Sequence, residues 1–175
     1  MDEIKALLVK DAILTENSQQ ARELAEKSSY GKIQPDGRIR LCYLEAVYLA
    51  EKQKLIILDG KKKTIQYEEL CKKATKQEHD FWTRYPVFRD FRNRGYIIKT
   101  ALKFGADFRV YERGKKPGEE HAKWIVYPVK ESATMTWQEF AAKNRVAHST
   151  KKKLLMAVVD DEGDVSYWEV RWLRP

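Results

Sequence analysis

A change of rhythm near residue 95 is the sequence feature that most constrains this fold. Beyond it, five short runs rich in β-branched and aromatic residues are separated by turn residues, a pattern typical of strands. The runs cover 96–104, 107–113, 121–129, 153–160 and 165–173. One helix interrupts them at 136–149, where Thr136 and Glu139 form a capping box. With a helix at 84–95, started by Pro86 and stopped by Gly95, this predicts an α/β (α+β) unit with a five-stranded mixed sheet and two helices.

The first 80 residues predict a smaller domain of helices and a mixed sheet. Apolar residues in MDEIKALLVKDAILT indicate a strand pair, and KLIILDG indicates a buried strand. Helices are expected at 18–29, with Ser18 as cap, at 40–53, and after a short strand within 63–76. A domain boundary is placed near 76–84, which gives an N-terminal domain 1–80 and a C-terminal domain 81–175.

The formal net charge of +8 lies almost wholly in the second half of the chain. Residues 1–80 carry 15 Lys and Arg against 14 Asp and Glu, whereas residues 81–175 carry 19 against 12. This asymmetry favours a polyanion as partner of the second half, nucleic acid before anionic lipid. The alternative is a Lys- and Glu-rich surface of the kind that thermophilic proteins carry.

Neither cysteine, Cys42 or Cys71, belongs to a C-x-x-C motif, and both lie in segments expected to be helical. Two buried, reduced thiols in an intracellular protein are therefore expected, without a disulfide framework or a zinc site. The first ten residues lack the basic start and apolar run of a signal peptide. No apolar stretch approaches the ~18 residues that a membrane span needs. We expect a cytoplasmic protein with no membrane partner.

Four motifs follow one another in the second half of the chain. They are G-Y-x-x-K at 95–99, F-G-x-D-F-x-V-Y at 104–111, H-A at 121–122 and R-V-A-H-S-x-x-K at 145–152. Because the four motifs occur in this order, residues 85–175 resemble the core of archaeal tRNA-splicing endonucleases. The first 80 residues resemble that family's N-terminal domain more loosely. The resemblance implies an RNA endonuclease that needs no metal and no cofactor. Such enzymes excise introns from precursor tRNA at bulge–helix–bulge motifs and leave 2′,3′-cyclic phosphate and 5′-hydroxyl ends.

The resemblance places the family's catalytic tyrosine, histidine and lysine on Tyr111, His121 and Lys152. Lys152 is the middle residue of a KKK triplet, so a slip of one residue in the comparison would select Lys151 or Lys153 instead. Two strands that flank a polar loop would bring Tyr111 and His121 to one end of the sheet. Lys152 would join them at the start of the next strand.

The three side chains suit the chemistry of RNA cleavage by its own 2′-hydroxyl. That reaction needs a base for the 2′-hydroxyl proton, an acid for the departing 5′-oxygen and a cation for the phosphorane. His121 is suited to donate a proton near neutral pH. Tyr111 is the candidate base, and since a free tyrosine has a pKa of about 10, it needs neighbouring cations. Lys152 would favour both the phenolate and the phosphorane.

The resemblance also implies contacts with the RNA beyond the reacting phosphate. Arg145 matches an arginine that holds a flipped bulge base between planar groups, a mode in which guanidinium stacks on splayed bases. The second surface should come from the C-terminal strand, where Arg171, Arg174 and Trp172 all remain candidates.

Two features bear on assembly. The last strand, 165–173, carries tryptophans without a proline and is expected to be an edge that invites pairing with another chain. The run DDEGD indicates a hairpin turn, and by resemblance its acidic residues Asp160, Asp161, Glu162 and Asp164 form a loop that inserts into a neighbouring subunit. A homodimer, a homotetramer or a heterotetramer with a related subunit would fit.

Two other functions remain open at this point. A non-catalytic RNA-binding subunit of the same kind of complex would carry the fold with a relict site. A metal-dependent nuclease is less favoured, because Asp107 and Glu112 are not followed by E-x-K at strand spacing. The histidines His79, His121 and His148 lack ligand spacing for zinc, and His148 is expected to pack or cap on its helix.

Overall fold

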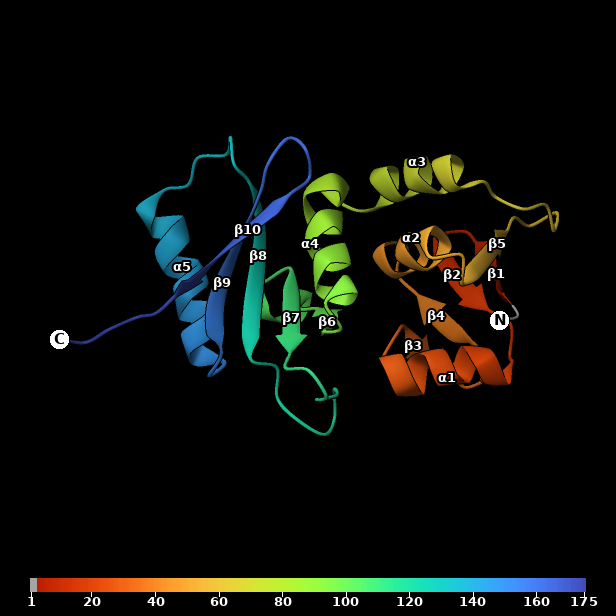
Figure 1. Cartoon of the computed structure of the whole chain (residues 1–175), viewed down its shortest axis with the longest axis horizontal. Helices are drawn as coiled ribbons and strands as arrows, with labels where there is room; N and C mark the ends of the chain where they lie inside the picture. Colours follow the sequence, from red (N-terminus) through yellow and green to blue (C-terminus); the bar gives the residue numbers. More distant parts are fainter. Residues whose placement is uncertain (1–2) are drawn as a thin grey trace. The chain divides into compact units, whose positions relative to one another are not determined.

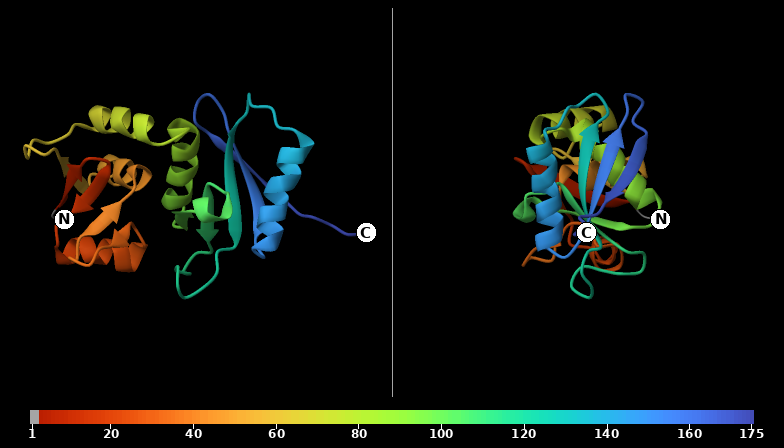
Figure 2. Two further views of the ribbon diagram at one scale, coloured as in Figure 1. Left: turned by 180° about the vertical axis from the view of Figure 1, so that it is seen from behind. Right: turned by 90° about the vertical axis from the view of Figure 1, so that its left-hand side faces the viewer.

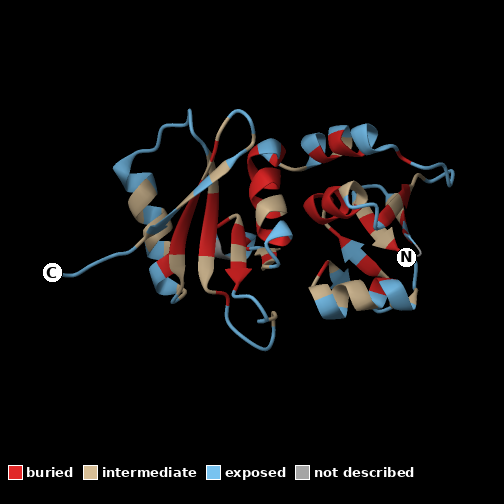
Figure 3. Cartoon of the chain, viewed as in Figure 1, coloured by how far each residue is buried: buried red, intermediate tan, exposed pale blue. Residues whose placement is uncertain are grey.

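The computed structural model describes residues 3–175, and the chain separates into two compact units, Met1–Phe81 and Trp82–Pro175 (Figure 1). Each unit has its own sheet and its own buried residues (Figure 3). Among the described residues, no helix has the length and apolar character needed to cross a membrane.

The N-terminal unit holds a five-stranded sheet in the order β3-β4-β2-β1-β5. Its strands are β1 (Ile4–Val9), β2 (Ala12–Thr15), β3 (Lys32–Ile33), β4 (Ile39–Leu41) and β5 (Leu55–Leu58). Its helices are α1 (Gln19–Ser28), α2 (Tyr43–Glu51) and α3 (Tyr67–Gln77). β1 pairs antiparallel with β2 and parallel with β5, so the prediction of helices with a mixed sheet is confirmed.

Local sequence explains most of these elements, and two boundaries differ from the prediction. The Ser18 hydroxyl accepts a hydrogen bond from the Ala21 amide at 3.2 Å and caps α1 as expected. The helix expected from residue 40 begins only at Tyr43, because Ile39–Leu41 pairs with β2. The short strand expected before α3 is reduced to a single bridge between Leu58 and Thr64.

The cysteines differ in part from the expectation. Cys71 lies in α3 and is buried, and burial raises the pKa of its thiol. Cys42 precedes α2 as its N-cap residue and is only half-buried. Neither cysteine takes part in a disulfide among the described residues.

The C-terminal unit holds the predicted five-stranded mixed sheet, in the order β10-β9-β8-β7-β6. Its strands are β6 (Ile97–Thr100), β7 (Phe108–Tyr111), β8 (Trp124–Lys130), β9 (Lys153–Val159) and β10 (Val165–Val170). Its helices, α4 (Phe81–Asn93) and α5 (Trp137–Ser149), lie on opposite sides of the sheet (Figure 2, left). Only the β8–β9 pair is parallel, and α5 is the crossover between these two strands.

Alternation along the strands sends one set of side chains to each helix. Toward α4, Phe108 packs on Phe88 and Tyr167 packs on Phe91, with ring centroids 6.3 and 5.1 Å apart. Toward α5, the core cluster contains Ala147 of the helix with Ile125 and further apolar residues of β8 and β9. The predicted capping box starts α5, because the Thr136 hydroxyl accepts from the Glu139 amide at 3.2 Å and the Glu139 carboxylate accepts from the Thr136 amide at 2.7 Å.

Several predicted boundaries in this unit were wrong, among them the start of β8, which lies at Trp124 and not at His121. α4 begins at Phe81 and encloses Pro86, since burial of Phe81 and Tyr85 holds the earlier turn in the helix. β6 ends at Thr100 because the chain turns through a short 3-10 helix, Leu102–Phe104. β10 ends at Val170, whose partner Leu154 is the second residue of β9, so little partner strand remains for Trp172.

Candidate active site

Sheet topology brings the three predicted catalytic positions to one end of the C-terminal sheet, where strands begin or finish. β8 and β9 are parallel, so both begin at this end, and β7, antiparallel to β8, finishes there. Tyr111 is the last residue of β7, His121 precedes β8, and Lys152 immediately precedes β9. The loop between β7 and β8 projects beyond this end (Figure 1).

Tyr111, His121 and Lys152 line one cavity of about 360 Å³. The rest of its lining comes from Arg109 of β7 and from the loop residues Gly118, Glu119, Glu120 and Ala122. The structure thus places a phenol, an imidazole and an amine around a space that one phosphate group can enter.

Tyr111 lines the cavity from the end of a paired strand. Its side chain is buried at the end of β7, with 3% of the residue exposed. Because strand side chains alternate, Arg109 lies on the same face of β7 as Tyr111. The guanidinium carbon of Arg109 lies 5.9 Å from the centroid of the Tyr111 ring. A cation therefore lies beside the Tyr111 ring.

His121 is exposed at the C-terminal end of the 112–123 loop. Two ion pairs hold the loop: Glu112 pairs with Lys123 across its base, and the Lys115 amino group lies 2.9 Å from the Glu120 carboxylate nearer its tip. The Lys115 ammonium, with a smaller contribution from His121, holds the pKa of Glu120 below its usual value. These two ion pairs therefore close the loop that carries His121.

Lys152 is the lysine of the KKK triplet that reaches the cavity. Its amino group donates to the Thr150 carbonyl at 2.9 Å, and burial together with the charge of Arg109 lowers its pKa. Lys151 is exposed and does not line the cavity, and the Lys153 amino group lies 3.1 Å from the Glu169 carboxylate. The geometry therefore favours the middle residue of the triplet.

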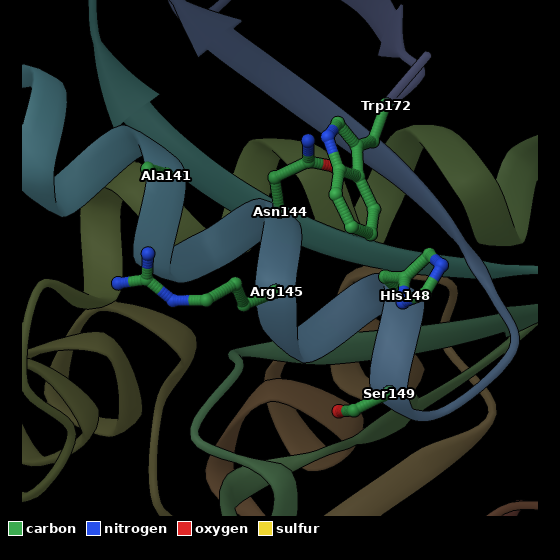
Figure 4. A pocket seen from close by; sticks show the side chains of 6 residues that line it. All are labelled: Ala141, Asn144, Arg145, His148, Ser149 and Trp172. Carbon is green, nitrogen blue, oxygen red and sulfur yellow. The ribbon is translucent and has the colours of Figure 1, made fainter. Parts of the chain in front are cut away.

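A second hollow, of about 550 Å³, lies along α5 beside the C-terminal tail (Figure 4). Arg145, His148 and Trp172 line it, with Ala141, Asn144 and Ser149. The His148 and Trp172 rings meet edge to face with centroids 4.5 Å apart, so the expectation that His148 packs is confirmed.

Of the three candidates for the second base-binding surface, Trp172 alone joins Arg145 in lining this hollow. Arg171 pairs with Glu169 at 2.9 Å, and the guanidinium carbon of Arg174 lies 5.4 Å from the Trp172 ring centroid. Trp172 reaches the hollow from outside β10, contrary to its predicted place in the last strand.

The DDEGD run forms the predicted hairpin turn between β9 and β10. The Asp160 carboxylate accepts hydrogen bonds from the backbone amides of Glu162 at 3.0 Å and Asp164 at 2.9 Å. Gly163 takes a φ of 84°, which suits glycine. Asp160 therefore shapes the turn, and the exposed residues Asp161, Glu162 and Asp164 present its charge.

Glu169 of β10 connects several side chains, a role that the sequence did not indicate. It accepts from the Trp124 indole at 3.1 Å and pairs with Lys153 and Arg171. The hydrogen bond from Trp124 and those from the two cations lower the pKa of Glu169 to about 2. The cluster links β8, β9 and β10 near the end of the sheet where β8 and β9 begin.

We expect Glu169→Gln to lower the free energy of unfolding by about 1 kcal/mol at pH 7, the range of a partly exposed ion-pair network. A carboxylate whose folded pKa lies below its unfolded value of about 4.3 stabilises the fold above that pH, and the stabilisation is lost toward pH 2. Urea unfolding at pH 7 and pH 3 measures this, with the exposed Glu131→Gln as control. A deficit equal at both pH values would contradict a charge effect.

Sequence reasoning missed Arg109 and Glu120 as cavity residues. For Arg109 a signal was present: a residue two positions before Tyr111 in a strand shares its face. For Glu120 no pattern was available, because the fold of the 112–123 loop depends on the pairing of Lys115 with Glu120.

Together, the fold and the cavity define a two-unit α+β protein with a cavity lined by a tyrosine, a histidine and a lysine at one end of its second sheet. A family model described as tRNA intron endonuclease, catalytic C-terminal domain, matches residues 81–167, and a model described as tRNA intron endonuclease, N-terminal domain, matches residues 4–71. The chain belongs to the tRNA intron endonuclease family, which confirms the resemblance found in the sequence.

Curated relatives named tRNA-splicing endonuclease align along nearly the whole chain. The relative from Methanothermobacter thermautotrophicus is 44% identical, over 89% of this chain and 89% of its own length. The relative from Thermococcus onnurineus is 37% identical over 94% and 93%, and the relative from Pyrococcus furiosus is 36% identical over 98% and 97%.

Proposed function

We propose that this chain is the catalytic subunit of a tRNA-splicing endonuclease and that it excises introns from precursor tRNA at bulge–helix–bulge motifs. Residues 1–80 and 81–175 would be its N-terminal and catalytic domains. The observation that carries the proposal is the single cavity shared by Tyr111, His121 and Lys152. Membership of the tRNA intron endonuclease family and relatives named tRNA-splicing endonuclease support the same substrate class.

The proposed reaction uses the RNA's own 2′-hydroxyl as nucleophile and needs no metal ion. Tyr111, as phenolate, takes the 2′-hydroxyl proton while the 2′-oxygen attacks the adjacent phosphorus. His121, as imidazolium, gives a proton to the departing 5′-oxygen, and Lys152 stabilises the charge of the phosphorane. The P–O5′ bond breaks, so the products carry a 2′,3′-cyclic phosphate and a 5′-hydroxyl. Arg109 lies beside the Tyr111 ring, and Lys152 lines the same cavity, so both cations are near the proposed base.

The hollow along α5 is the proposed site for a flipped bulge base. Arg145 and Trp172 both line it, and each offers a flat surface on which a base can stack. Two of its lining residues, His148 and Trp172, contact each other edge to face. A base held there would fix the bulge while the scissile phosphate lies in the cavity.

We propose that the active form is an oligomer. β10 is at an edge of the C-terminal sheet and carries Trp168 half-exposed, which suits pairing with a second chain. The exposed acidic turn, 161–164, suits insertion into a basic surface of a neighbouring subunit. A homodimer, a homotetramer and a heterotetramer with a related subunit are all compatible with these features.

We expect the purified protein to cut a bulge–helix–bulge RNA in the presence of EDTA and to leave cyclic phosphate and 5′-hydroxyl ends. End-group analysis of the products, with and without EDTA or Mg²⁺, is the measurement. Products with a 3′-hydroxyl and a strict need for Mg²⁺ would show a metal-dependent nuclease instead. Tight binding without any cut would favour the alternative of a non-catalytic RNA-binding subunit.

A further inference from the structure

Arg109 is a cation of the active-site cavity to which neither the family comparison nor the chemistry above assigns a substrate contact. It lies in the middle of β7, paired with Ile125 of β8 and Lys99 of β6, so its backbone is fixed from both sides. The side chain is half-buried and lines the cavity together with Lys152.

Among residues 3–175, the Arg109 guanidinium forms no ion pair, although the carboxylates of Glu119 and Glu120 also line the cavity. Its Nε is buried and has no hydrogen-bond partner among residues 3–175. The Glu120 carboxylate, which lines the same cavity, is engaged by Lys115 at 2.9 Å. A buried donor without a partner is rare in folded proteins and calls for an explanation.

Stacking on Tyr111 does not supply that explanation. The guanidinium carbon is 5.9 Å from the ring centroid, close to the limit of about 6 Å at which a ring attracts a cation. Arg109 also stands near a second cation, since its charge helps to lower the pKa of Lys152. Two neighbouring cations facing one cavity are mutually unfavourable until an anion enters between them.

We propose that Arg109 binds a non-bridging oxygen of the scissile phosphate and is a further catalytic residue of this site. The inference rests on the proposed function, because it takes the cavity as the place of RNA cleavage. The phosphorane carries one more negative charge than the phosphodiester, and the Lys152 amino group already donates to Thr150. A planar guanidinium supplies the additional donors, in a geometry that matches phosphate oxygens.

The test uses Arg109→Gln and Arg109→Lys in the full-length protein, with Lys130→Gln as a control that removes a charge outside the cavity. Single-turnover cleavage is measured on a bulge–helix–bulge RNA and on stereopure phosphorothioates at the scissile position. We expect Arg109→Gln to slow cleavage by about 10²-fold and Arg109→Lys by about tenfold, the cost of a lost or weakened charge-assisted contact. Affinity for an uncleavable 2′-deoxy RNA should change less than about threefold, since the contact strengthens in the transition state.

The phosphorothioates separate substrate contact from a purely structural role. If Arg109 touches a phosphate oxygen, the rate loss caused by sulfur in one diastereomer should shrink in Arg109→Gln. Slower cleavage with an unchanged sulfur effect, or cleavage within about threefold of wild type, would overturn the proposal. Should Arg109→Gln fail to fold by thermal denaturation, Arg109→Lys carries the same comparison.

A second measurement does not depend on cleavage. Inorganic phosphate should raise the thermal unfolding midpoint of wild type and Lys130→Gln more than that of Arg109→Gln. If wild type cuts no RNA but shows this Arg109-dependent effect, the proposed function fails and the anion site stands. If wild type cleaves and Arg109→Gln responds to phosphate as wild type does, the Arg109 inference fails alone.

Discussion

Replacing His121 by alanine is expected to slow RNA cleavage by about 10²–10⁴-fold, the contribution of a positioned general acid. The 5′-oxygen is a poor leaving group unless it is protonated as the P–O bond breaks. His121 is exposed at the edge of the cavity, where the leaving oxygen can reach it. No other histidine lines this cavity among the described residues. Affinity for a 2′-deoxy RNA should change by less than about threefold, since the imidazole acts on the departing oxygen in the transition state.

Single-turnover rates of His121→Ala and wild type measure this effect. His79→Ala is the matched control, because this exposed imidazole of the N-terminal unit pairs with its neighbour Asp80, at 3.0 Å, and does not line the cavity. A chemically activated leaving group, such as a 5′-thiolate at the cleavage position, should recover most of the lost rate in His121→Ala. If the variant still cut the normal RNA within tenfold of wild type, His121 would not be the general acid.

The sequence predicted the sheets and helices because alternation and capping are local signals. The five runs after residue 95 became β6–β10, and the capping box at Thr136 starts α5. The boundaries that failed depend on tertiary contacts. α4 begins early because Phe81 and Tyr85 are buried, and β10 ends where its pairing with β9 ends.

For the candidate site, the sequence predicted which three side chains share a cavity but not the residues around them. Strand order was enough to predict that Tyr111 and His121 meet at one end of the sheet. The choice within the KKK triplet was beyond the sequence, because it depends on which amine faces the cavity and which pairs with Glu169. The position of Trp172 could not be predicted from the sequence either, because this residue lies beyond the end of β10 and packs on His148.

Lys152→Ala is the second large effect that we expect, a loss of about 10²–10³-fold in cleavage rate, as for removal of one electrostatic donor from a preorganised site. The Lys152 amine is held at the cavity wall by its hydrogen bond to Thr150, so it is positioned before substrate binds. Its partial burial also strengthens its interaction with a charged phosphorane, because the local dielectric is lower than in water. Single-turnover cleavage measures the loss in rate, and 2′-deoxy RNA binding measures any loss in affinity.

The neighbouring lysines are matched controls for this prediction, because all three variants remove one ammonium from the same triplet. Lys151→Ala removes an exposed charge at a position with φ of 54°, and should weaken RNA binding at most modestly, with a normal rate at saturation. Lys153→Ala breaks the pair with Glu169 and should lower stability more than rate. A rate loss that follows Lys151 or Lys153 in place of Lys152 would mean that the triplet shifts by one residue when RNA binds. The amine at the phosphorus would then be chosen by the substrate and not by the fold of the free chain.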